Sequence, residues 1–512
     1  MTNTWKQYEA GKDYKRRIGF YEQGRRNERF YRGDQWYEHH GKDLPKPVFN
    51  VVKRVVDYLV CTVASDRFSL TYTDENLPFV RDGVTAEQIR SALSVMSDSA
   101  SYRWSKCRMD DIVYQLLLDA AIFGDGVAYC YWDEKTGDGL LRGDVAVQTV
   151  DAANLFAADM NRADIQSQDY IILSGRQTAS SLRAEALVAG VSPDKARKIL
   201  PDEEREGAGS LATTELADED GKATYLVKFY REDGHVVYEK STRECLIRRV
   251  VTDCHLYPVA HFRWTPVKNA FHGAAPASEM IANQKFINRA YGMVMKHMTD
   301  TAFSKVVYDK SRIPEWSNEV GEAIAVVGAT NVSDAVSVVG AGSMQGGYLD
   351  LIDSAISSTK ELMGATETAL GNTVPNNTSA ILALREAAKV SLGHVESALC
   401  RCIEDIANVW ADMMCAYYPD ERLLPLEKEG MPTSEAVDFS LLRGCLIRAR
   451  VDVRETAQYS TSTTTALLDK LLDGGYISVE TYLTYLPDGV FPERRAILEA
   501  KEALLNGARD HE

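Results

Sequence analysis

The sequence has no long uninterrupted apolar segment. No run approaches the roughly 20 apolar residues that a membrane-spanning helix needs. Met1–Tyr8 is polar and aromatic and lacks the apolar centre of a signal peptide. We therefore expect a protein that is made and used in the soluble interior of a cell and that has no membrane partner.

Motifs of the common enzyme and metal sites are also missing. The nine cysteines, scattered from Cys61 to Cys445, include no pair with zinc-finger or thioredoxin spacing, which fits reduced and mostly buried thiols. The P-loop, Gly-x-Ser-x-Gly and His-Glu-x-x-His patterns do not occur. The pair His39-His40 is more typical of a loop surface than of a metal site. We expect no catalytic residue, no metal and no cofactor.

One glycine-rich stretch, 338–346, has some likeness to a dinucleotide-binding loop, because it follows a predicted strand and precedes a predicted helix. Its spacing is Gly-x-Gly-x-x-x-Gly, which differs from the common fingerprint. No βαβ pattern surrounds it, and no acidic residue ends a second strand about 20 residues further on, where the ribose would need one. A joint between a small module and a helix is the better interpretation. The enzyme alternative predicts stabilisation by nucleotide in a thermal-shift measurement.

Positive charge is in deficit, with 58 Lys and Arg against 74 Asp and Glu and a net charge of -16. Proteins that grip DNA usually have the opposite balance, and an acidic excess is common among soluble proteins. The most basic stretch lies at 12–32, where Tyr14, Ile18 and Tyr21 recur at helical spacing. Contact with nucleic acid and a solvated helix face are equally consistent with this stretch.

Helical and strand-like periodicities predict an α+β chain that is mainly α. The expected helices lie at about 12–32, 48–64, 102–121, 276–301, 348–370, 378–418, 466–472, 479–486 and 492–505. The expected strands lie at 127–132, 224–230, 236–239, 305–308, 323–327, 335–339 and 445–453. The charged stretch 193–220 reads as a surface excursion, and the hydroxyl run 460–465 as a linker or helix cap.

Two of these helices bracket a small module. The first, 276–301, begins with Pro276 in its first turn and would be about 39 Å long. A compact α+β insert follows at 304–346, and the second helix returns from 348. The polar loop 371–377 then has the turn-forming composition of an exposed segment. This order is the geometry of a stalk with a tip.

Several short motifs occur in the order found in the portal proteins of tailed bacteriophages. They are Tyr31-Arg32-Gly33-Asp34-Gln35-Trp36, Asn50, Phe123-Gly124-Asp125-Gly126 before the Tyr129–Trp132 strand, Gln284 with Asn288, Asn377-Thr378-Ser379-Ala380, and Leu472–Thr481. Each motif alone is weak, but their order and spacing extend over nearly the whole chain. The chain therefore resembles a phage portal protein, the head-to-tail connector.

The resemblance implies a portal-like fold assembled as a ring. Its parts would be a wing at 1–275, a first stem helix at 276–303, a small α/β clip at 304–346, a second stem helix at 347–370, a tunnel loop at 371–377, a long helix returning to the wing at 378–455, and a helical crown at 456–512.

The resemblance also implies a function and partners. The ring, a homo-oligomer of typically twelve subunits, would sit at one capsid vertex of the virion, after assembly in the host bacterial cytoplasm. Double-stranded DNA would pass through it non-specifically during packaging and ejection. Its protein partners would be the terminase large subunit, a head-completion adaptor, the major capsid protein and the scaffold. The alternative is a structural or internal virion scaffold protein that is not a portal.

Three groups of residues are candidate sites under this resemblance. The tunnel loop comprises Asn372, Thr373, Val374, Pro375, Asn376 and Asn377. Asp350, Asp353 and Glu361 are candidates for a negative channel lining, and the rival interpretation is that they face solvent or pair with Lys285, Arg289 or Lys360 of a neighbour. Ile313, Pro314 and Trp316 are candidate clip anchors, since apolar and aromatic groups dominate interfaces; for Trp316 alone, a place in the core of the module is the stronger interpretation.

Overall fold

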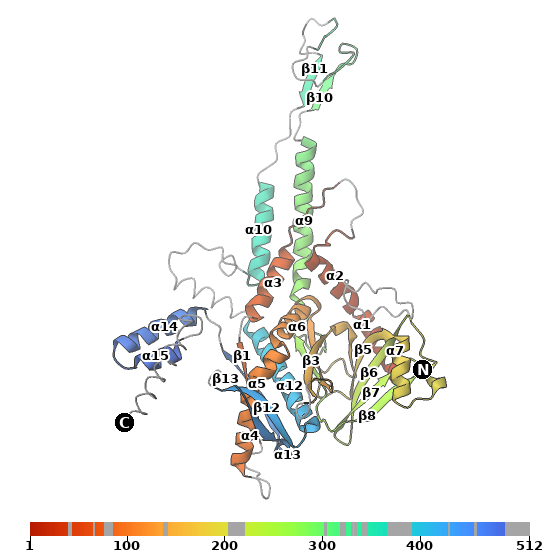
Figure 1. Cartoon of the computed structure of the whole chain (residues 1–512). Coiled ribbons are helices and arrows are strands. Elements are labelled where there is room, and N and C mark those ends of the chain that lie inside the picture. Colours follow the sequence, from red (N-terminus) through yellow and green to blue (C-terminus); the bar gives the residue numbers. More distant parts are fainter. Residues whose placement is uncertain are drawn as a thin grey trace. The chain divides into compact units, whose positions relative to one another are not determined.

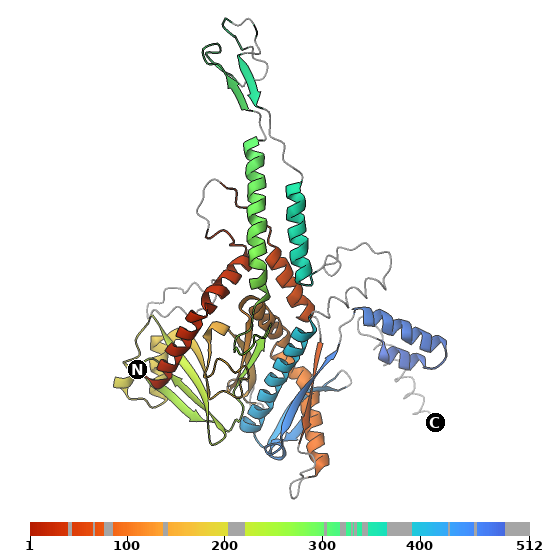
Figure 2. The ribbon, with the colours of Figure 1, turned by 180° about the vertical axis from the view of Figure 1, so that it is seen from behind.

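The computed structural model (Figures 1 and 2) describes residues 1–38, 44–64, 67–75, 85–136, 142–202, 221–301, 305–317, 324–328, 331, 335–339, 347–365, 392–428, 431–454 and 458–486. The chain forms two compact units, one of Met1–Ala64 and Leu70–Arg450, the other of Ser65–Ser69 and Val451–Glu512. Within the described ranges, no helix is long and apolar enough to cross a membrane.

The first unit begins with three helices, α1 (Asn3–Arg17), α2 (Phe20–Arg32) and α3 (Val51–Ala64). The single helix predicted around 12–32 is therefore wrong, because Gly19 adopts a left-handed conformation (φ 70°) and separates α1 from α2. Trp5 and Phe30 are among the largest fully buried side chains. The predicted helix 48–64 is confirmed as α3, which buries its valine stripe.

Three more helices follow, α4 (Ala86–Asp98), α5 (Ala100–Lys106) and α6 (Met109–Phe123). The prediction missed α4, which begins with a capping box between Thr85 and Gln88. The predicted helix 102–121 is interrupted at Arg108, whose φ is 50°. The left-handed residue turns the chain, so that α6 packs on strand β2.

Two antiparallel sheets form the β-rich part (Figure 1). The first has the order β3-β2-β9, with β2 (Asp125–Asp133), β3 (Asp144–Val150) and β9 (Val259–Arg263). The second has the order β4-β5-β6-β7-β8, with β4 (Leu155–Ala157), β5 (Tyr170–Thr178), β6 (Lys222–Glu232), β7 (His235–Ser241) and β8 (Leu246–Val251). The strands predicted at 127–132, 224–230 and 236–239 are confirmed as parts of β2, β6 and β7.

A shared apolar core holds the two sheets together. Val127 of β2, Val259 of β9 and Phe229 of β6 belong to one buried cluster. The 3-10 helix η2 (Ala152–Asn154) contributes to the same cluster. Helices α7 (Ala179–Val188) and α8 (Pro193–Ala196) pack in a separate apolar cluster with residues of β6 and β8. Most of the predicted excursion, 203–220, lies outside the described residues.

Helices α9 (Pro276–Thr301) and α10 (Gly347–Leu362) lie side by side (Figures 1 and 2). Asn283 of α9 donates to the Thr359 hydroxyl of α10 at 3.1 Å. The prediction of 276–301 as a helix is confirmed at both ends. The helix predicted at 348–370 is confirmed as α10 up to Leu362, and 366–370 lie outside the described residues.

Between the two helices in chain order, β10 (Lys305–Tyr308) and β11 (Val336–Val339) form an antiparallel hairpin with Lys305 opposite Val339. These two strands were predicted. The strand predicted at 323–327 is wrong, because residues 324–328 form no strand. The described residues of this segment contain no helix, so the α part of the predicted α/β clip has no support there.

The rest of the first unit centres on α12 (Gly393–Tyr417), which buries Trp410 and Ile403. The hairpin β12 (Glu421–Lys428) with β13 (Met431–Asp438) and the short α13 (Phe439–Leu442) follow. Strand β14 (Ile447–Arg454), which was predicted at 445–453, pairs with β1 (Arg67–Asp74), and residues of both strands belong to each unit. The predicted stretch 378–391 lies outside the described residues.

The second unit contains α14 (Gln458–Asp473) and α15 (Val479–Tyr485). The predicted linker at 460–465 is wrong, because these residues lie within α14. Ser and Thr cost a helix only about half a kcal/mol each, and the apolar residues that follow outweigh this cost. Ser478 caps α15 by accepting the N–H of Thr481 at 3.2 Å. The helix predicted at 492–505 lies outside the described residues.

Candidate functional site: the root and the surface of the stem helices

A buried side-chain amide fixes the lower part of α9 to α3. Oε1 of Gln284 accepts the backbone N–H groups of Val51 at 2.9 Å and Val52 at 3.3 Å. These N–H groups belong to the first turn of α3 and have no partner inside that helix. Nε2 of Gln284 donates to the carbonyl oxygen of Phe49 at 2.8 Å and to Oδ1 of Asn288 at 2.9 Å. Gln284 therefore uses its acceptor to cap α3 and its donors to hold the residues around it.

The amide chain continues from α9 to the end of α2. Nδ2 of Asn288 donates to Oε1 of Gln35 at 2.6 Å, and Nε2 of Gln35 donates to the carbonyl of Phe30 at 2.9 Å. Asn50 donates to the same carbonyl at 3.1 Å and to that of Tyr31 at 2.9 Å. The side chains of four motif residues, Gln35, Asn50, Gln284 and Asn288, thus lie in one hydrogen-bonded group. The sequence singled them out, but only the structure brings them together.

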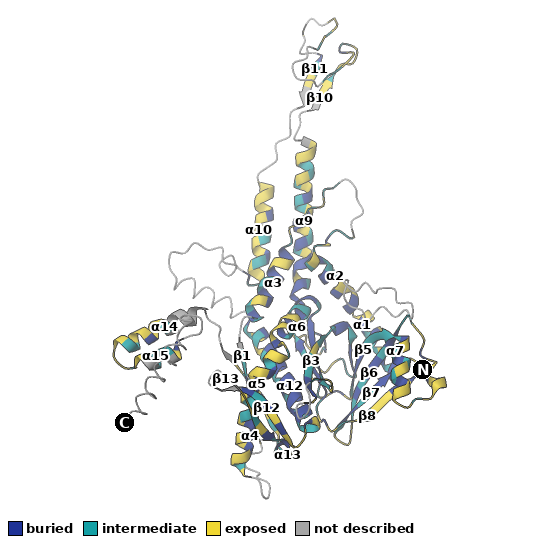
Figure 3. Cartoon of the chain, viewed as in Figure 1, coloured by how far each residue is buried: buried dark blue, intermediate teal, exposed yellow. Residues whose placement is uncertain are grey.

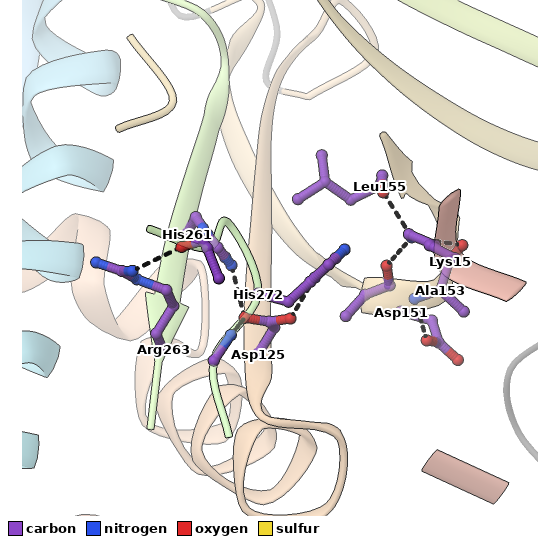
Figure 4. A network of polar contacts seen from close by, with 11 residues as sticks. Lys15, Asp125, Asp151, Ala153, Leu155, His261, Arg263 and His272 are labelled. Carbon is purple, nitrogen blue, oxygen red and sulfur yellow. Dashed lines mark hydrogen bonds and ion pairs between the residues drawn. The ribbon is translucent and has the colours of Figure 1, made fainter. Parts of the chain in front are cut away.

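A second buried network lies at the start of β2 (Figure 4). Oδ1 of Asp125 accepts Nε2–H of His261 at 3.0 Å and the backbone N–H of Gly273 at 2.8 Å, and Oδ2 accepts Nδ1–H of His272 at 2.6 Å. Burial by itself would raise the pKa of Asp125, but His272 and His261 hold it below its usual value. Asp125 stands in one of the motifs, whereas nothing in the sequence pattern pointed to the two histidines.

Lys15 of α1 is fully buried beside this network (Figure 4). Its ammonium donates to the backbone carbonyls of Ala152, Ala153 and Leu155 at 2.7, 3.0 and 2.7 Å. Three acceptors need three N–H groups, which only the charged form of lysine carries. Burial lowers the pKa of Lys15 to about 7. Lys15 therefore fixes α1 to η2 and the start of β4.

The acidic residues proposed for a channel lining lie on one face of α10. Asp350, Asp353 and Glu361 are all exposed. Much of α10 is exposed (Figure 3). Successive residues of an α-helix are about 100° apart, so the three carboxylates share a face. The buried residues of α10, Ile352 and Thr359, lie on the opposite face, where α9 packs.

Helices α9 and α10 also expose large apolar side chains. On α10, Tyr348 and Leu351 are each 54% exposed and Leu362 is 79% exposed. On α9, Phe286 is 46% exposed and Met293 is 65% exposed. Apolar side chains that recur along two neighbouring helices mark a surface suited to contact with another protein.

The candidate clip residues differ in exposure. Ile313 is fully buried, Pro314 is exposed, and Trp316 is half-buried. The Trp316 ring stacks on that of Tyr308, with the ring centroids 5.3 Å apart. Pro314 is thus the one residue of the three with an open surface. The tunnel-loop residues 372–377 lie outside the described residues.

Several basic residues of α1 and α2 have partners within the chain. Arg16 pairs with Asp13 at 2.7 Å, and Arg32 pairs with Glu28 at 2.8 Å. Lys15 is buried, as described above. These contacts favour a structural helix surface over a nucleic-acid site. Over the described ranges, no cluster of His, Cys, Asp and Glu is arranged to hold a metal.

Comparison with known proteins identifies the segment that contains both stem helices. Residues 263–435 match the family model of the phage P22-like portal protein. The chain carries a phage portal region. This match confirms the resemblance indicated by the sequence motifs, and it supports a portal role for the chain. The portal region extends from the last residue of β9 into β13 and includes Gln284 and Asn288.

Comparisons with solved structures and with curated proteins do not identify the fold or the function further. A solved structure described as "Neck of empty GTA particle computed with C6 symmetry" is similar at 10% sequence identity, with a TM-score of 0.37, over 85% of this chain and 89% of that chain. A TM-score of this size does not establish a shared fold. No curated protein matches the chain.

Proposed function

We propose that the chain is the subunit of a ring-shaped portal channel at one capsid vertex, through which double-stranded DNA is packaged and later ejected. The observation that carries this proposal is the pair α9 and α10. Two long helices pack side by side within the segment that matches the portal family model, and a small hairpin lies between them in the chain. We propose twelve subunits, a wing at 1–275 and a helical crown at 456–512.

The acidic face of α10 supports a channel that does not hold DNA. Each Lys or Arg that neutralises a phosphate adds salt-dependent affinity, which would slow a moving duplex. Asp350, Asp353 and Glu361 repel phosphates instead. Asp350 and Glu361 lie opposite the face that contacts α9, and Asp353 lies at the flank of that face, near Tyr291 of α9. All three are exposed and can line an opening when copies are arranged in a circle.

The exposed apolar side chains of the stem support contact between copies. On α10, Leu351 and Leu362 lie between the acidic face and the face that packs on α9. We propose that this flank meets Phe286 and Met293 of a neighbour's α9. Since the two surfaces differ, the contact is head-to-tail and closes into a ring when the rotation between copies divides a full turn.

The tunnel loop, residues 372–377, is proposed to narrow the channel and to touch DNA reversibly through uncharged amides and hydroxyls. Deleting Thr373–Asn376 should leave ring assembly intact and reduce the DNA packaged or retained per particle. Normal packaging by the deletion variant would refute this role.

The clip, residues 304–346, is proposed to dock the terminase large subunit during packaging and a head-completion adaptor afterwards. Pro314, with its open surface, is the first contact to test, and Ile313 and Trp316 would support it from within the module. Energy from ATP would come from the terminase, and the chain itself would have no catalytic role. The capsid protein and scaffold would contact the ring during assembly in the host cytoplasm, and the finished ring would belong to the virion.

Electron microscopy of the purified chain tests the proposal. Portal subunits form rings with a central hole, whereas a non-portal scaffold protein would form particles without one. A thermal-shift measurement with nucleotides tests the enzyme alternative, and the portal proposal predicts no shift.

A further inference from the structure

We propose that Asp125, His261 and His272 form a latch at the root of α9 that opens at acid pH. In the closed state, the latch holds the loop before α9 against the start of β2. Protonation of His272 releases the loop from the start of β2 and loosens the attachment of α9. The inference rests on the buried geometry and does not depend on the proposed function.

The carboxylate of Asp125 joins three segments that are distant in sequence. Asp125 is the first residue of β2, His261 lies in β9, and His272 with Gly273 lies in the loop that leads to Pro276, where α9 begins. Three N–H groups from two of these segments converge on the carboxylate, at 2.6 to 3.0 Å. Loss of these hydrogen bonds would detach the end of the loop from the start of β2, while Arg263 of β9 still donates to the Ala270 carbonyl at 3.3 Å.

Each histidine offers the carboxylate its only N–H. The remaining ring nitrogens, Nδ1 of His261 and Nε2 of His272, are buried and have no hydrogen-bond partner in the described part of the chain. A neutral imidazole satisfies this arrangement, because its second nitrogen carries a lone pair and no hydrogen. A protonated imidazole would place a buried N–H where no acceptor lies. The closed latch therefore disfavours protonation of His272.

The packing around the rings leaves them no local route to water. His261 stacks on Phe271 with ring centroids 4.6 Å apart, and His272 packs on Phe20 at 4.3 Å. Gly124, with φ at 97°, lies so close to the loop that a Cβ atom there would collide with the carbonyl oxygen of Gly273. A protonated histidine thus reaches solvent only when the loop moves.

Several charged groups face the latch from the surrounding elements. They are Lys15 of α1, Asp151 ahead of η2, Arg263 of β9 and, beyond Arg263, Arg401 of α12. Burial lowers the pKa of His272, and Lys15 and His261 lower it further. Asp125 raises it, but the net shift of the pKa is downward. The open loop, being solvated, takes up a proton near the ordinary histidine value of about 6.5. Protons therefore bind the open state more readily, and opening is favoured as pH falls below that value.

Backbone hydrogen–deuterium exchange of the intact full-length protein tests the latch. The matched variant combines His261→Gln and His272→Asn, because each amide nitrogen replaces the ring nitrogen that donates to Asp125 and neither amide titrates. Exchange is compared at pH 7.5 and pH 5.5 in peptides covering residues 259–276, after correction for the intrinsic rate. Protonation of His272 raises the equilibrium constant for opening by up to about tenfold per pH unit.

We expect opening of this segment in the wild type to rise at least about fivefold on acidification, and in the double variant to change less than about twofold. An equal pH response in the two proteins would overturn the proposal. If the double variant does not fold, a measurement on the wild type still tests the proposal. Exchange of the imidazole C2 hydrogen gives the titration midpoint of His272, which we expect below about 6.5. A midpoint at or above that value would also overturn the proposal.

Discussion

Gln284 illustrates how one side chain determines the position of a helix. Its acceptor caps α3, and its donors satisfy the Phe49 carbonyl and Asn288. Every polar group of this amide has a buried partner, so a change in the pattern of donors and acceptors leaves at least one group unsatisfied. Charge and hydrogen-bond type therefore matter here more than size.

Gln284→Glu tests this point with almost no change in volume. The carboxylate can still accept from Val51 and Val52, but its second oxygen faces the Phe49 carbonyl and Oδ1 of Asn288, which are both acceptors. If the Asn288 and Gln35 amides both rotate, Asn288 can donate to the carboxylate, but Oε1 of Gln35 then faces the carbonyl oxygen of Phe30 and two acceptors again meet. We expect a loss of about 2–4 kcal/mol in the free energy of unfolding, measured by denaturant titration at pH 7.5.

Asn283→Asp is the matched control for this substitution. Asn283 makes one side-chain bond, to the Thr359 hydroxyl, which itself donates to the Ala355 carbonyl at 2.7 Å. In the variant this hydroxyl can rotate and donate to the carboxylate in place of that carbonyl. The expected cost is below about 1 kcal/mol. Similar losses in the two variants would contradict the structural role assigned to Gln284.

Asp119 of α6 gives a prediction about pH. Burial raises its pKa to about 7, against the hydrogen bond from Gln115 and with help from Asp151 and Glu28. A raised carboxyl pKa means that the folded state holds its proton more tightly than the unfolded state, so this contribution to stability is lost as pH rises from about 4 to about 7. Asp119→Asn removes the loss. Melting temperatures of the variant and the wild type should be similar at pH 4.5, and the variant should be more stable at pH 8. A constant difference across this range would contradict the assignment.

At the scale of elements, the sequence predicts a helix or strand well where a long periodic pattern is bounded by proline or by a turn motif. Pro276 and the regular apolar positions after it defined α9 to the residue, and the turn at Asp233-Gly234 defined the hairpin of β6 and β7. Breaks were harder to predict. The left-handed residues at Gly19 and Arg108 divide predicted helices, and only the backbone angles reveal them.

The contacts of the site could not be predicted for a different reason. Asp125 and His272 are 147 residues apart, and Gln284 lies 233 residues after Val51. No local pattern encodes such pairs, because folding of both sheets and of α9 brings them together. The exposed face of α10, by contrast, follows from helical spacing alone once the helix is known.

The acidic face of α10 predicts how charge reversal would affect DNA. Replacing Asp350, Asp353 and Glu361 with lysine adds up to three phosphate contacts per subunit. In a plot of the logarithm of DNA affinity against the logarithm of salt concentration, each contact makes the negative slope steeper by about 0.9. We expect rings of this variant to retain linear duplex DNA at about 50 mM salt and to release it at higher salt, in a filter-retention measurement.

A closed DNA circle of the same length is the control, because it cannot thread a ring. The variant should retain the linear form and fail to retain the circle. Equal retention of both forms would place the three side chains outside the channel.

At the scale of the whole molecule, a channel of this kind needs more than one copy of the chain. The exposed apolar side chains of α9 and α10 and the acidic face beside them have no complete role in a single subunit. Head-to-tail repetition covers the apolar side chains and turns the carboxylates toward a common axis. The same repetition makes the hole through which DNA would pass.

Cryo-electron microscopy of the purified full-length chain tests this claim most directly. We expect closed rings with a central hole, in which α9 of one subunit contacts α10 of the next. Asp350, Asp353 and Glu361 should face the hole. A particle that stays monomeric, with both helices packed only against their own chain, would contradict it.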